Sequence, residues 1–305
     1  MRILFVGLGS IGTRHLKNVV SELTNRNISF TIDALRTTNN VLGSDIASNI
    51  CKTYMDFSEI EEIYDVTFIT NPTYMHYETL KKVAPVSRAV LIEKPLFCDT
   101  KVDLDALGLV NENIYYIACP LRRSPVIRRM KEIAEKSKVY AVRAICSSYL
   151  PDWRKNTDYR NSYSAHVEEG GGVRGDLIHE MDYIIDIFGE PTSASSYSSK
   201  ISALEIDSDD IALYNLIYRD KVVSLHLDYF GRVPRRELEF FTEEDTIIGD
   251  IVKGTVTWLK TGVVEKLAPI DIHKEEIHYF FDLVQGKESN INDINRAFGV
   301  LQIAQ

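Results

Sequence analysis

The chain begins with a short apolar run that leads into three closely spaced glycines. Residues 3–6 are apolar, the sequence Gly7-Leu8-Gly9-Ser10-Ile11-Gly12 follows, and residues 13–23 carry apolar side chains at helical spacing. In a G-x-G-x-x-G turn, the first glycine permits the tight turn, the second lets the backbone approach a pyrophosphate, and the third lets the helix pack closely on the strand. Glycines also serve ordinary turns, but this turn joins a strand to a helix. It therefore predicts a dinucleotide site formed by Gly7, Gly9, Ser10, Ile11 and Gly12.

An apolar run after an initial methionine can also open a secretory signal. Here the run covers only residues 3–6, whereas the apolar part of a signal sequence has roughly 7 to 15 residues. No small-residue cleavage site follows it, and no apolar stretch of the chain approaches the roughly 20 residues that span a bilayer. We therefore expect a cytoplasmic protein without membrane segments.

The composition favours small molecules as partners. The 305 residues carry a formal charge of -9, and the pI is about 5.4. This balance disfavours a broad electrostatic attraction to nucleic acid or to an anionic membrane. The four cysteines form no Cys-x-x-Cys pair, so neither a metal site nor a disulfide framework is predicted.

Apolar strands alternate with helical segments over the first 118 residues. We expect strands at 3–6, 29–35, 66–70, 89–92 and 114–119, and helices at 13–23, 58–64, 75–84 and 101–111. Continuous apolar strands that alternate with helices are typical of a parallel doubly wound sheet. The chain is thus predicted to be an α/β protein whose residues 1–118 form a dinucleotide-binding Rossmann domain.

Strands dominate the remainder of the chain, residues 119–305. In the strand expected at 222–230, the side chains of Val223, Leu225, Leu227 and Tyr229 share one face. This alternation predicts a second α/β domain with a mostly antiparallel open sheet that is covered on one side. The expected helices are 125–137, 174–188, 273–285 and 292–304; the strands are 139–150, 194–202, 211–219, 222–230, 236–241, 246–252 and 255–259; a long loop covers 151–172.

The end of the second strand bears on the choice between NAD and NADP. An acidic residue at this position normally binds the ribose 2'-hydroxyl of NAD. Here Arg36 stands at the expected strand end and is followed by Thr37 and Thr38. An arginine with hydroxyl groups suits a 2'-phosphate, which favours NADP. The alternative is that Asp33 binds the ribose of NAD and that Arg36 is a solvated surface residue.

Two further segments carry groups suited to proton and hydride chemistry. Glu93-Lys94-Pro95 follows a buried strand, at the sheet edge where α/β proteins bind ligands, and the Lys94 ammonium can hydrogen-bond a substrate oxygen. In the helix expected at 174–188, Asp176 and His179 share one face, so a carboxylate could orient a histidine that transfers a proton. Taken singly, Lys94 could equally be a surface lysine, Asp176 a helix cap and His179 a core histidine.

Together and in this order, the motifs resemble the glucose-fructose oxidoreductase, inositol dehydrogenase and rhizopine-catabolism (Gfo/Idh/MocA) family of NAD(P)-dependent sugar oxidoreductases. The resemblance covers nearly the whole chain and includes the glycine turn, the segments 70–76, 93–95 and 121–125, and the Asp/His helix. It implies an N-terminal Rossmann domain, at 1–118. It also implies a C-terminal domain, at 119–305, that binds substrate and dimerises through its sheet. The chain is therefore expected to be an NAD(P)-dependent sugar dehydrogenase or reductase that forms a homo-oligomer.

The resemblance also implies a role for each matched residue. Lys94 would polarise the reacting hydroxyl or carbonyl, and His179 would be the general base in oxidation and the acid in reduction. Asp176 would bind substrate or orient His179. Many members have Asp-x-x-x-His where this chain has Asp-x-x-His, and both spacings share a helix face. The residues implied to line the cofactor are Thr70, Asn71, Pro72, His76, Glu93 and Lys94.

The loop at 151–172 is the expected specificity region, because it runs into the Asp/His helix. Loops carry function but also merely connect elements, so packing on a neighbouring segment is the alternative. The similarity to members with the same loop suggests a sugar of surface-polysaccharide or sialic-acid-like metabolism. Aromatic rings can stack on sugars, and arginines can bind a carboxylate or a nucleotide diphosphate. The candidate substrate-binding residues of these types are Trp153, Tyr159, Tyr163, Arg122, Arg154 and Arg160.

Two other functions are compatible with the sequence. One is a non-enzymatic NAD(P)-sensing regulator, because a fold does not fix a function. The presence of both Lys94 and His179 favours an enzyme over this regulator. The other is a glycosidase that uses bound NAD for transient oxidation, which would turn over without net reduction of the cofactor.

Overall fold

Two compact units make up the chain in the computed structural model, which describes residues 1–37 and 41–305. The first unit contains residues 1–118 and 273–298, and the second contains residues 119–272 and 299–305. The division after Ala118 falls where the sequence pattern changes. The sequence pattern does not indicate that residues 273–298 return to the first unit.

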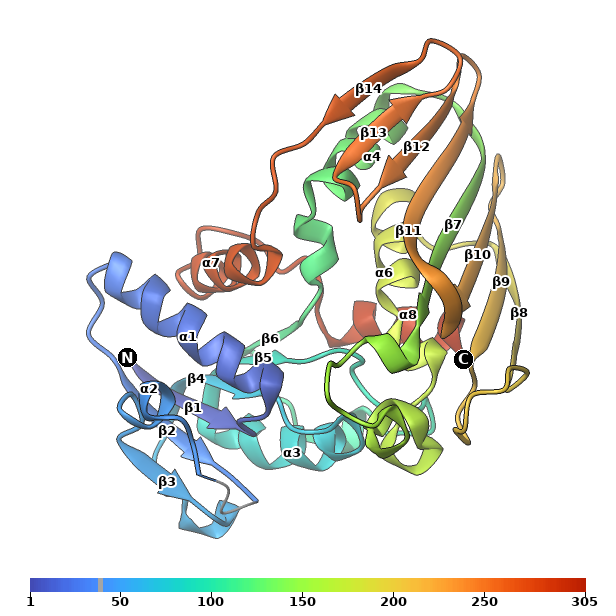
Figure 1. The fold of residues 1–305 in the computed structure, drawn as a ribbon. Helices are drawn as coiled ribbons and strands as arrows, with labels where there is room; N and C mark the ends of the chain where they lie inside the picture. Colours follow the sequence, from blue (N-terminus) through green and yellow to red (C-terminus); the bar gives the residue numbers. More distant parts are fainter. Residues whose placement is uncertain (38–40) are drawn as a thin grey trace. The chain divides into compact units, whose positions relative to one another are not determined.

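The first unit is built on a six-stranded parallel sheet with the order β3-β2-β1-β4-β5-β6 (Figure 1). The predicted doubly wound sheet is therefore confirmed, with β3 as an additional short edge strand. The order reverses between β1 and β4, which is the point where such sheets bind ligands. The strands are β1 (Arg2–Val6), β2 (Thr31–Leu35), β3 (Lys52–Tyr54), β4 (Tyr64–Ile69), β5 (Ser87–Ile92) and β6 (Ile114–Ile117).

Helices cover both faces of this sheet. α1 (Ser10–Asn25) and α3 (His76–Val83) lie on opposite faces (Figure 1), as right-handed crossovers require when strands are added in opposite directions from β1. α7 (Ile272–Val284) and the first residues of α8 (Ile294–Ala304) complete the unit, and α2 (Ser44–Ala47) is a single turn.

An aromatic stack explains why α7 belongs to the first unit. Phe5 of β1 stacks on Phe68 of β4 with ring centroids 4.6 Å apart, and Phe280 of α7 meets Phe68 edge-on at 5.7 Å. All three rings are completely buried. Burial of a phenylalanine side chain stabilises a fold by roughly 1.5–3 kcal/mol, so Phe280 provides a strong reason for the chain to return to this sheet.

Two helices expected from the sequence are wrong, and each is reduced to a short 3-10 turn. Between 58 and 64 only Phe57–Glu59 is helical, because Ile60 is already extended and Tyr64 begins β4. Between 101 and 111 only Asp105–Leu107 is helical. There the Asp103 carboxylate accepts the N–H groups of Asp105 and Ala106, and Gly108 ends the turn in the left-handed region. Such side-chain bonds to the backbone compete with helix formation.

A charged cluster joins the end of α1 to α7. The Arg26 guanidinium donates to Glu22 at 2.6 Å and to Asp282 at 2.7 Å, and its side chain is 13% exposed. Burial opposes the charge of Glu22, but the hydrogen bonds from Arg26 and His278 keep its pKa below the ordinary value. Arg26 likewise lowers the pKa of Asp282.

Arg26→Ala is expected to reduce the free energy of unfolding by about 2 kcal/mol at neutral pH, because it removes the closest cation from two largely buried carboxylates and leaves them only His278 and Lys287. Both carboxylates have depressed pKa values in the folded state. Their contribution is therefore present above the unfolded pKa values of about 4 and is lost as the pH falls below them. Urea unfolding of both proteins from pH 7 to pH 3 should show the difference shrinking in acid. Arg88→Ala is the control, because Arg88 is 73% exposed and such pairs contribute less than about 1 kcal/mol. An equal loss in both variants would contradict the prediction.

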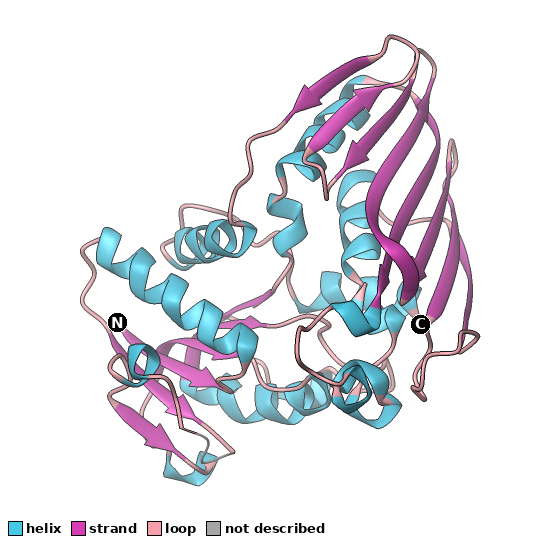
Figure 2. Cartoon of the chain, viewed as in Figure 1, coloured by secondary structure: helices cyan, strands magenta, loops and turns pink. Residues whose placement is uncertain are grey.

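The second unit contains an eight-stranded sheet with the order β14-β13-β12-β11-β7-β10-β9-β8, whose strands are labelled in Figure 1 and drawn in magenta in Figure 2. Only β7 and β10 pair in parallel, so the predicted mostly antiparallel sheet is confirmed. The short edge strand β14 was not predicted from the sequence. The strands are β7 (Val139–Tyr149), β8 (Ser193–Ser199), β9 (Ile211–Ile217), β10 (Val222–Asp228), β11 (Phe230–Thr242), β12 (Thr246–Asp250), β13 (Thr255–Trp258) and β14 (Val263–Lys266).

One face of this sheet is covered by α4 (Pro125–Lys136) and α6 (His179–Phe188), as Figure 1 shows. The predicted alternation in β10 is confirmed, because Val223, Leu225 and Leu227 are at most 2% exposed, as is Tyr229, which follows the strand. The opposite face carries large apolar side chains that are about half exposed: Tyr197, Ile217 and Val222.

Some classes of site are absent from residues 1–37 and 41–305. No helix in these ranges is long and apolar enough to cross a membrane. No group of three or more His, Cys, Asp or Glu side chains there is arranged to hold a metal ion.

Candidate active site

Two of the three glycines in the turn after β1 are required by their surroundings. Gly7 has φ +93°, and a Cβ on it would lie 2.7 Å from the backbone nitrogen of Asn71. A Cβ on Gly12 would lie 2.5 Å from the carbonyl oxygen of Gly7 and 2.6 Å from Oγ1 of Thr70. Gly7 therefore adopts a backbone conformation that favours glycine, and Gly12 allows α1 to pack closely against the turn.

Gly9 differs from the other two glycines. It has φ -73°, which any residue adopts, and no atom lies within 4 Å of the position that its Cβ would take. α1 begins at the next residue. The N-terminus of α1 has no side-chain cap, and its first turn contains no acidic residue. An uncapped helix N-terminus presents N–H groups and a positive dipole end to an anion. The open side of Gly9 thus fits a pyrophosphate, with Ser10 and Ile11 in the first turn of the helix.

Thr70 supports this turn from the end of β4. Its hydroxyl donates to the carbonyl of Gly7 at 2.6 Å, and its residue is only 5% exposed. Next to it, Asn71 donates its side-chain NH₂ to Thr79, while its buried Oδ1 has no partner among the described residues. Asn71 therefore keeps an acceptor for a ligand, whereas Thr70 shapes the turn.

His76 is a buried cross-link, contrary to the expectation that it lines the cofactor. It is 1% exposed, with Nδ1 3.1 Å from the carbonyls of Pro95 and Leu96 and Nε2 3.0 Å from the carbonyl of Asn71. Burial lowers the pKa of its imidazole. The ring thus joins the segment after β4 to the segment after β5. Pro72 remains exposed.

The end of β2 is occupied by Arg36, as predicted. Arg36 follows the last strand residue, Leu35, and is half-buried, and Thr37 is exposed. Thr38 lies outside the described residues. The alternative ribose ligand, Asp33, is 5% exposed inside the strand, and its carboxylate accepts the hydroxyl of Tyr64 at 2.8 Å. The carboxylate of Asp33 is therefore buried and already hydrogen-bonded within the protein.

Lys94 lies two residues beyond β5, at the same sheet edge as the glycine turn, and is half-buried. The preceding Glu93 does not present its carboxylate to a ligand. One oxygen is 2.5 Å from Nε2 of His15, a completely buried residue of α1, and the other accepts the backbone N–H of Lys94 at 3.2 Å. The sequence signal for His15 was a polar residue on the apolar face of α1, next to Leu16.

In the second unit, the helix predicted at 174–188 is broken. α5 (Val173–Asp176) ends at Asp176, Leu177 and Ile178 interrupt the helix, and His179 is the first residue of α6. Asp176 and His179 therefore do not share one continuous helix face. His179 is half-buried and stands at the start of α6.

Two tyrosines hold the Asp176 carboxylate. Oδ1 accepts the hydroxyl of Tyr163 at 2.6 Å, and Oδ2 accepts the hydroxyl of Tyr229 at 2.7 Å. Burial and the negative charge of Asp176 raise the pKa of both tyrosines, so both remain donors. Tyr229 was not predicted as a site residue, because its place on the covered face of the sheet marked it as core. Asp176 is thus an anchor for Tyr163, which belongs to the loop at 151–172.

Two of the three arginines expected to bind an anion are occupied by carboxylates. The side chain of Arg122 is 2% exposed and binds Asp182 at 2.6 Å and Asp186 at 3.1 Å. Arg160 pairs with Asp158 at 2.8 Å and with Glu205. Arg122 therefore fixes α6 to the segment before α4. Arg160 joins Asp158 of its own loop to Glu205.

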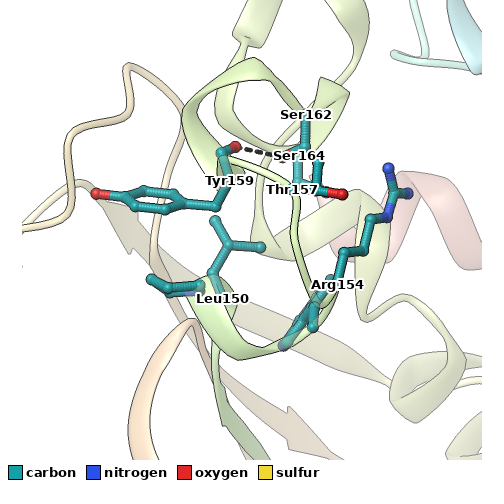
Figure 3. Close-up of a pocket in the computed structure, with 8 residues that line it drawn as sticks. Leu150, Arg154, Thr157, Tyr159, Ser162 and Ser164 are labelled. Carbon is teal, nitrogen blue, oxygen red and sulfur yellow. Dashed lines mark hydrogen bonds between the residues drawn. The ribbon is translucent and has the colours of Figure 1, made fainter.

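Arg154 is arranged differently. Its guanidinium lies 5.8 Å from the ring centroid of Tyr163, and none of the ion pairs found in the described residues involves it. It lines a pocket of the 151–172 loop, opposite Tyr159 (Figure 3). Trp153 is fixed nearby, since its indole N–H donates to Ser148 and its ring meets Tyr229 edge-on at 5.2 Å. The other lining residues are Leu150, Pro151, Thr157, Ser162 and Ser164.

The parallel sheet, its reversal between β1 and β4, and the glycine turn at that point define the first unit as a dinucleotide-binding Rossmann domain. Residues 1–107 match the model of the GFO_IDH_MocA family, described as an oxidoreductase family with an NAD-binding Rossmann fold. The resemblance indicated by the motifs is therefore confirmed for residues 1–107, which make up most of the first unit.

Solved structures share the fold over the whole chain. Levoglucosan dehydrogenase in complex with NADH and levoglucosan is 16% identical, with a TM-score of 0.80. The myo-inositol 2-dehydrogenase of Lactobacillus plantarum is 20% identical, with a TM-score of 0.79. UDP-N-acetylglucosamine 3-dehydrogenase of Acidithiobacillus ferrooxidans is 19% identical, with a TM-score of 0.76. Each comparison covers 100% of this chain and 95% of the other.

A curated relative matches over a shorter range. An uncharacterized oxidoreductase of Synechocystis sp. is 24% identical over 156 residues, which are 49% of this chain. The match spans 42% of the length of that relative.

Proposed function

We propose that the chain is an NAD(P)-dependent oxidoreductase that transfers hydride between the nicotinamide and a hydroxyl or carbonyl carbon of a sugar or sugar derivative. The observation that carries the proposal is the open side of Gly9 at the uncapped start of α1, in a turn whose other two glycines are fixed by packing. The similar dehydrogenases act on levoglucosan, myo-inositol and UDP-N-acetylglucosamine, as their names state. These names support the sugar substrate.

The bound nicotinamide would supply the hydride acceptor or donor, and the chain would supply positioning and proton transfer. The ammonium of Lys94 would donate a hydrogen bond to the reacting oxygen and stabilise the charge that develops there. His179 would accept the hydroxyl proton during oxidation and return it during reduction.

We propose NADP as the preferred cofactor, because Arg36 follows β2 where an acidic residue would select NAD, and Asp33 is occupied by Tyr64. Arg36→Ala is expected to weaken NADPH binding by about 10-fold and to leave NADH binding within about 2-fold, as loss of a charge-assisted hydrogen bond predicts. Fluorescence titration with both nucleotides measures this. The control is Arg88→Ala, near the start of β5 and therefore at the opposite sheet edge. If wild-type NADPH binds no more tightly than NADH, the proposal for Arg36 is wrong.

We further propose that the substrate carries an anionic group that binds Arg154 while the rings of Trp153, Tyr159 and Tyr163 contact the sugar. The test is a panel of neutral sugars, uronates, sialic acids and nucleotide sugars, read out as reduction of NADP or NAD. An anionic sugar should be the best substrate, and Arg154→Gln should lower its kcat/KM by about 10-fold or more. A neutral sugar as the best substrate would contradict the role of Arg154. Cofactor binding without turnover of any sugar would instead favour a regulator.

We propose that the exposed sheet face forms a homodimer interface and that the protein is cytoplasmic. Tyr197, Ile217 and Val222 lie on three adjacent strands of the second unit with about half of their surface exposed. Light scattering would measure the mass in solution, and Ile217→Asp with Val222→Asp should convert a dimer to a monomer. None of the four cysteines is part of a disulfide in the described residues, which suits a reducing compartment.

A further inference from the structure

A buried ion pair links the cofactor-binding helix to Lys94. His15 of α1 is 0% exposed, and its Nε2 lies 2.5 Å from Oε1 of Glu93, whose side chain is 12% exposed. Oε2 of the same carboxylate accepts the backbone N–H of Lys94 at 3.2 Å. Glu93 thus holds α1 with one oxygen and the Lys94 backbone with the other.

The surroundings favour the charged form of this pair. Burial lowers the pKa of His15, but the hydrogen bond and the charge of Glu93 outweigh burial and raise it above the ordinary value. Burial raises the pKa of Glu93, and His15 more than offsets this increase. Glu276 of α7 also favours the charged His15, whereas Arg14 opposes it, and the His273 ring lies edge-on to His15 at 6.1 Å.

We propose that His15 is a positioning residue for Lys94 and acts through Glu93. The helix whose first turn would bind the cofactor phosphates thereby also fixes the backbone of the residue that would meet the substrate oxygen. Without His15, the buried Glu93 carboxylate is still acted on by His273 and by the charge of the Lys94 ammonium. Glu93 then draws this ammonium away from the substrate. The inference rests on the proposed role of Lys94.

Two substitutions at His15 separate the hydrogen bond from the volume of the side chain. Glutamine places its amide nitrogen near the position of Nε2 and can still donate to Glu93, whereas the shorter asparagine cannot reach it. The readout is acetylation of Lys94 by sulfo-N-hydroxysuccinimidyl acetate, followed by peptide mass spectrometry, with the exposed Lys101 as the internal reference. His15→Asn should slow the acetylation of Lys94 at least about 3-fold, the effect of a new ion pair, and His15→Gln should stay within about 2-fold of wild type.

Glu93→Gln provides the opposite change. The charge of Glu93 already acts on Lys94 in the wild type, so removal of the carboxylate should make acetylation of Lys94 faster than in the wild type. This variant also carries the test if His15→Asn does not fold, which the melting temperature and circular dichroism show. Equal acetylation rates in the wild type, His15→Asn and Glu93→Gln would overturn the proposal, as would a rate for His15→Gln as slow as for His15→Asn.

Nucleotide binding is measured in parallel, with NADPH and NADH as probes. If the wild type binds neither nucleotide, the proposed function fails, while the acetylation rates still decide the role of His15. If the wild type binds nucleotide and turns over a sugar, His15→Asn should lower kcat at least about 10-fold with little change in the KM for nucleotide, as expected for loss of positioning at the reacting group.

Discussion

Lys94→Met and His179→Ala are each expected to retain nucleotide binding and to lose hydride transfer by at least about 100-fold, which corresponds to about 2.7 kcal/mol of transition-state stabilisation. The Lys94 side chain stands beyond β5, outside the glycine turn, so its removal leaves the proposed phosphate site intact. His179 starts α6 in the second unit and has no part in that turn. Methionine keeps the length of the lysine stem and removes only the cation.

The measurement combines steady-state kinetics on the best sugar of the panel with fluorescence titration of NADPH and NADH. Lys101→Met removes an exposed lysine from the first unit, and His226→Ala removes a partly exposed histidine from β10 of the second. Both controls should keep turnover within about 3-fold of the wild type, as surface changes do. Unchanged turnover in Lys94→Met and His179→Ala would refute both assigned roles. A loss of nucleotide binding in either variant would show that its effect is not on chemistry alone.

The motifs with a local physical cause could be predicted from the sequence. The glycine turn is determined by backbone sterics over six residues, and the structure gives Gly7 and Gly12 the close contacts that these rules require. Arg36 was expected at the end of the second strand, and it directly follows the last strand residue, Leu35. Alternation in β10 likewise depends only on near neighbours in the sequence.

The residues whose partners are distant in the sequence could not be assigned in this way. Arg122 looked available for an anion, but its carboxylate partners, Asp182 and Asp186, lie about sixty residues later. His76 matched a cofactor-lining motif, yet the fold brings carbonyls from two loops to its ring. A local pattern shows which groups are present, whereas burial and pairing depend on the tertiary fold.

The same limit explains the broken helix at Asp176 and the return of α7. The apolar spacing of 174–188 is helical throughout, so only the tertiary bonds of Asp176 to Tyr163 and Tyr229 mark the place where α5 ends. From the sequence, Phe280 is an ordinary core residue of a terminal helix. The local sequence does not indicate which of the two sheets it packs against.

Gly9→Ala and Gly12→Ala are expected to separate ligand binding from folding within one turn. Gly12→Ala should destabilise the protein by about 2 kcal/mol or more, because its Cβ would overlap the Gly7 carbonyl and the Thr70 hydroxyl. Gly9→Ala should change stability by less than about 1 kcal/mol, because its Cβ meets no protein atom within 4 Å and only the helix cap is altered. It should nevertheless weaken nucleotide binding at least about 10-fold, which is about 1.4 kcal/mol, because the methyl group occupies the space proposed for the pyrophosphate.

Urea unfolding and NADPH or NADH titration of the two variants provide the comparison, and each variant controls for the other. Addition of saturating nucleotide should raise the unfolding midpoint of the wild type but raise that of Gly9→Ala much less, because a ligand stabilises only the state that binds it. Gly12→Ala should begin from a lower midpoint even without nucleotide. If Gly9→Ala binds nucleotide as tightly as the wild type, then the open side of Gly9 is not the phosphate site. The proposed function would then lose the observation on which it depends.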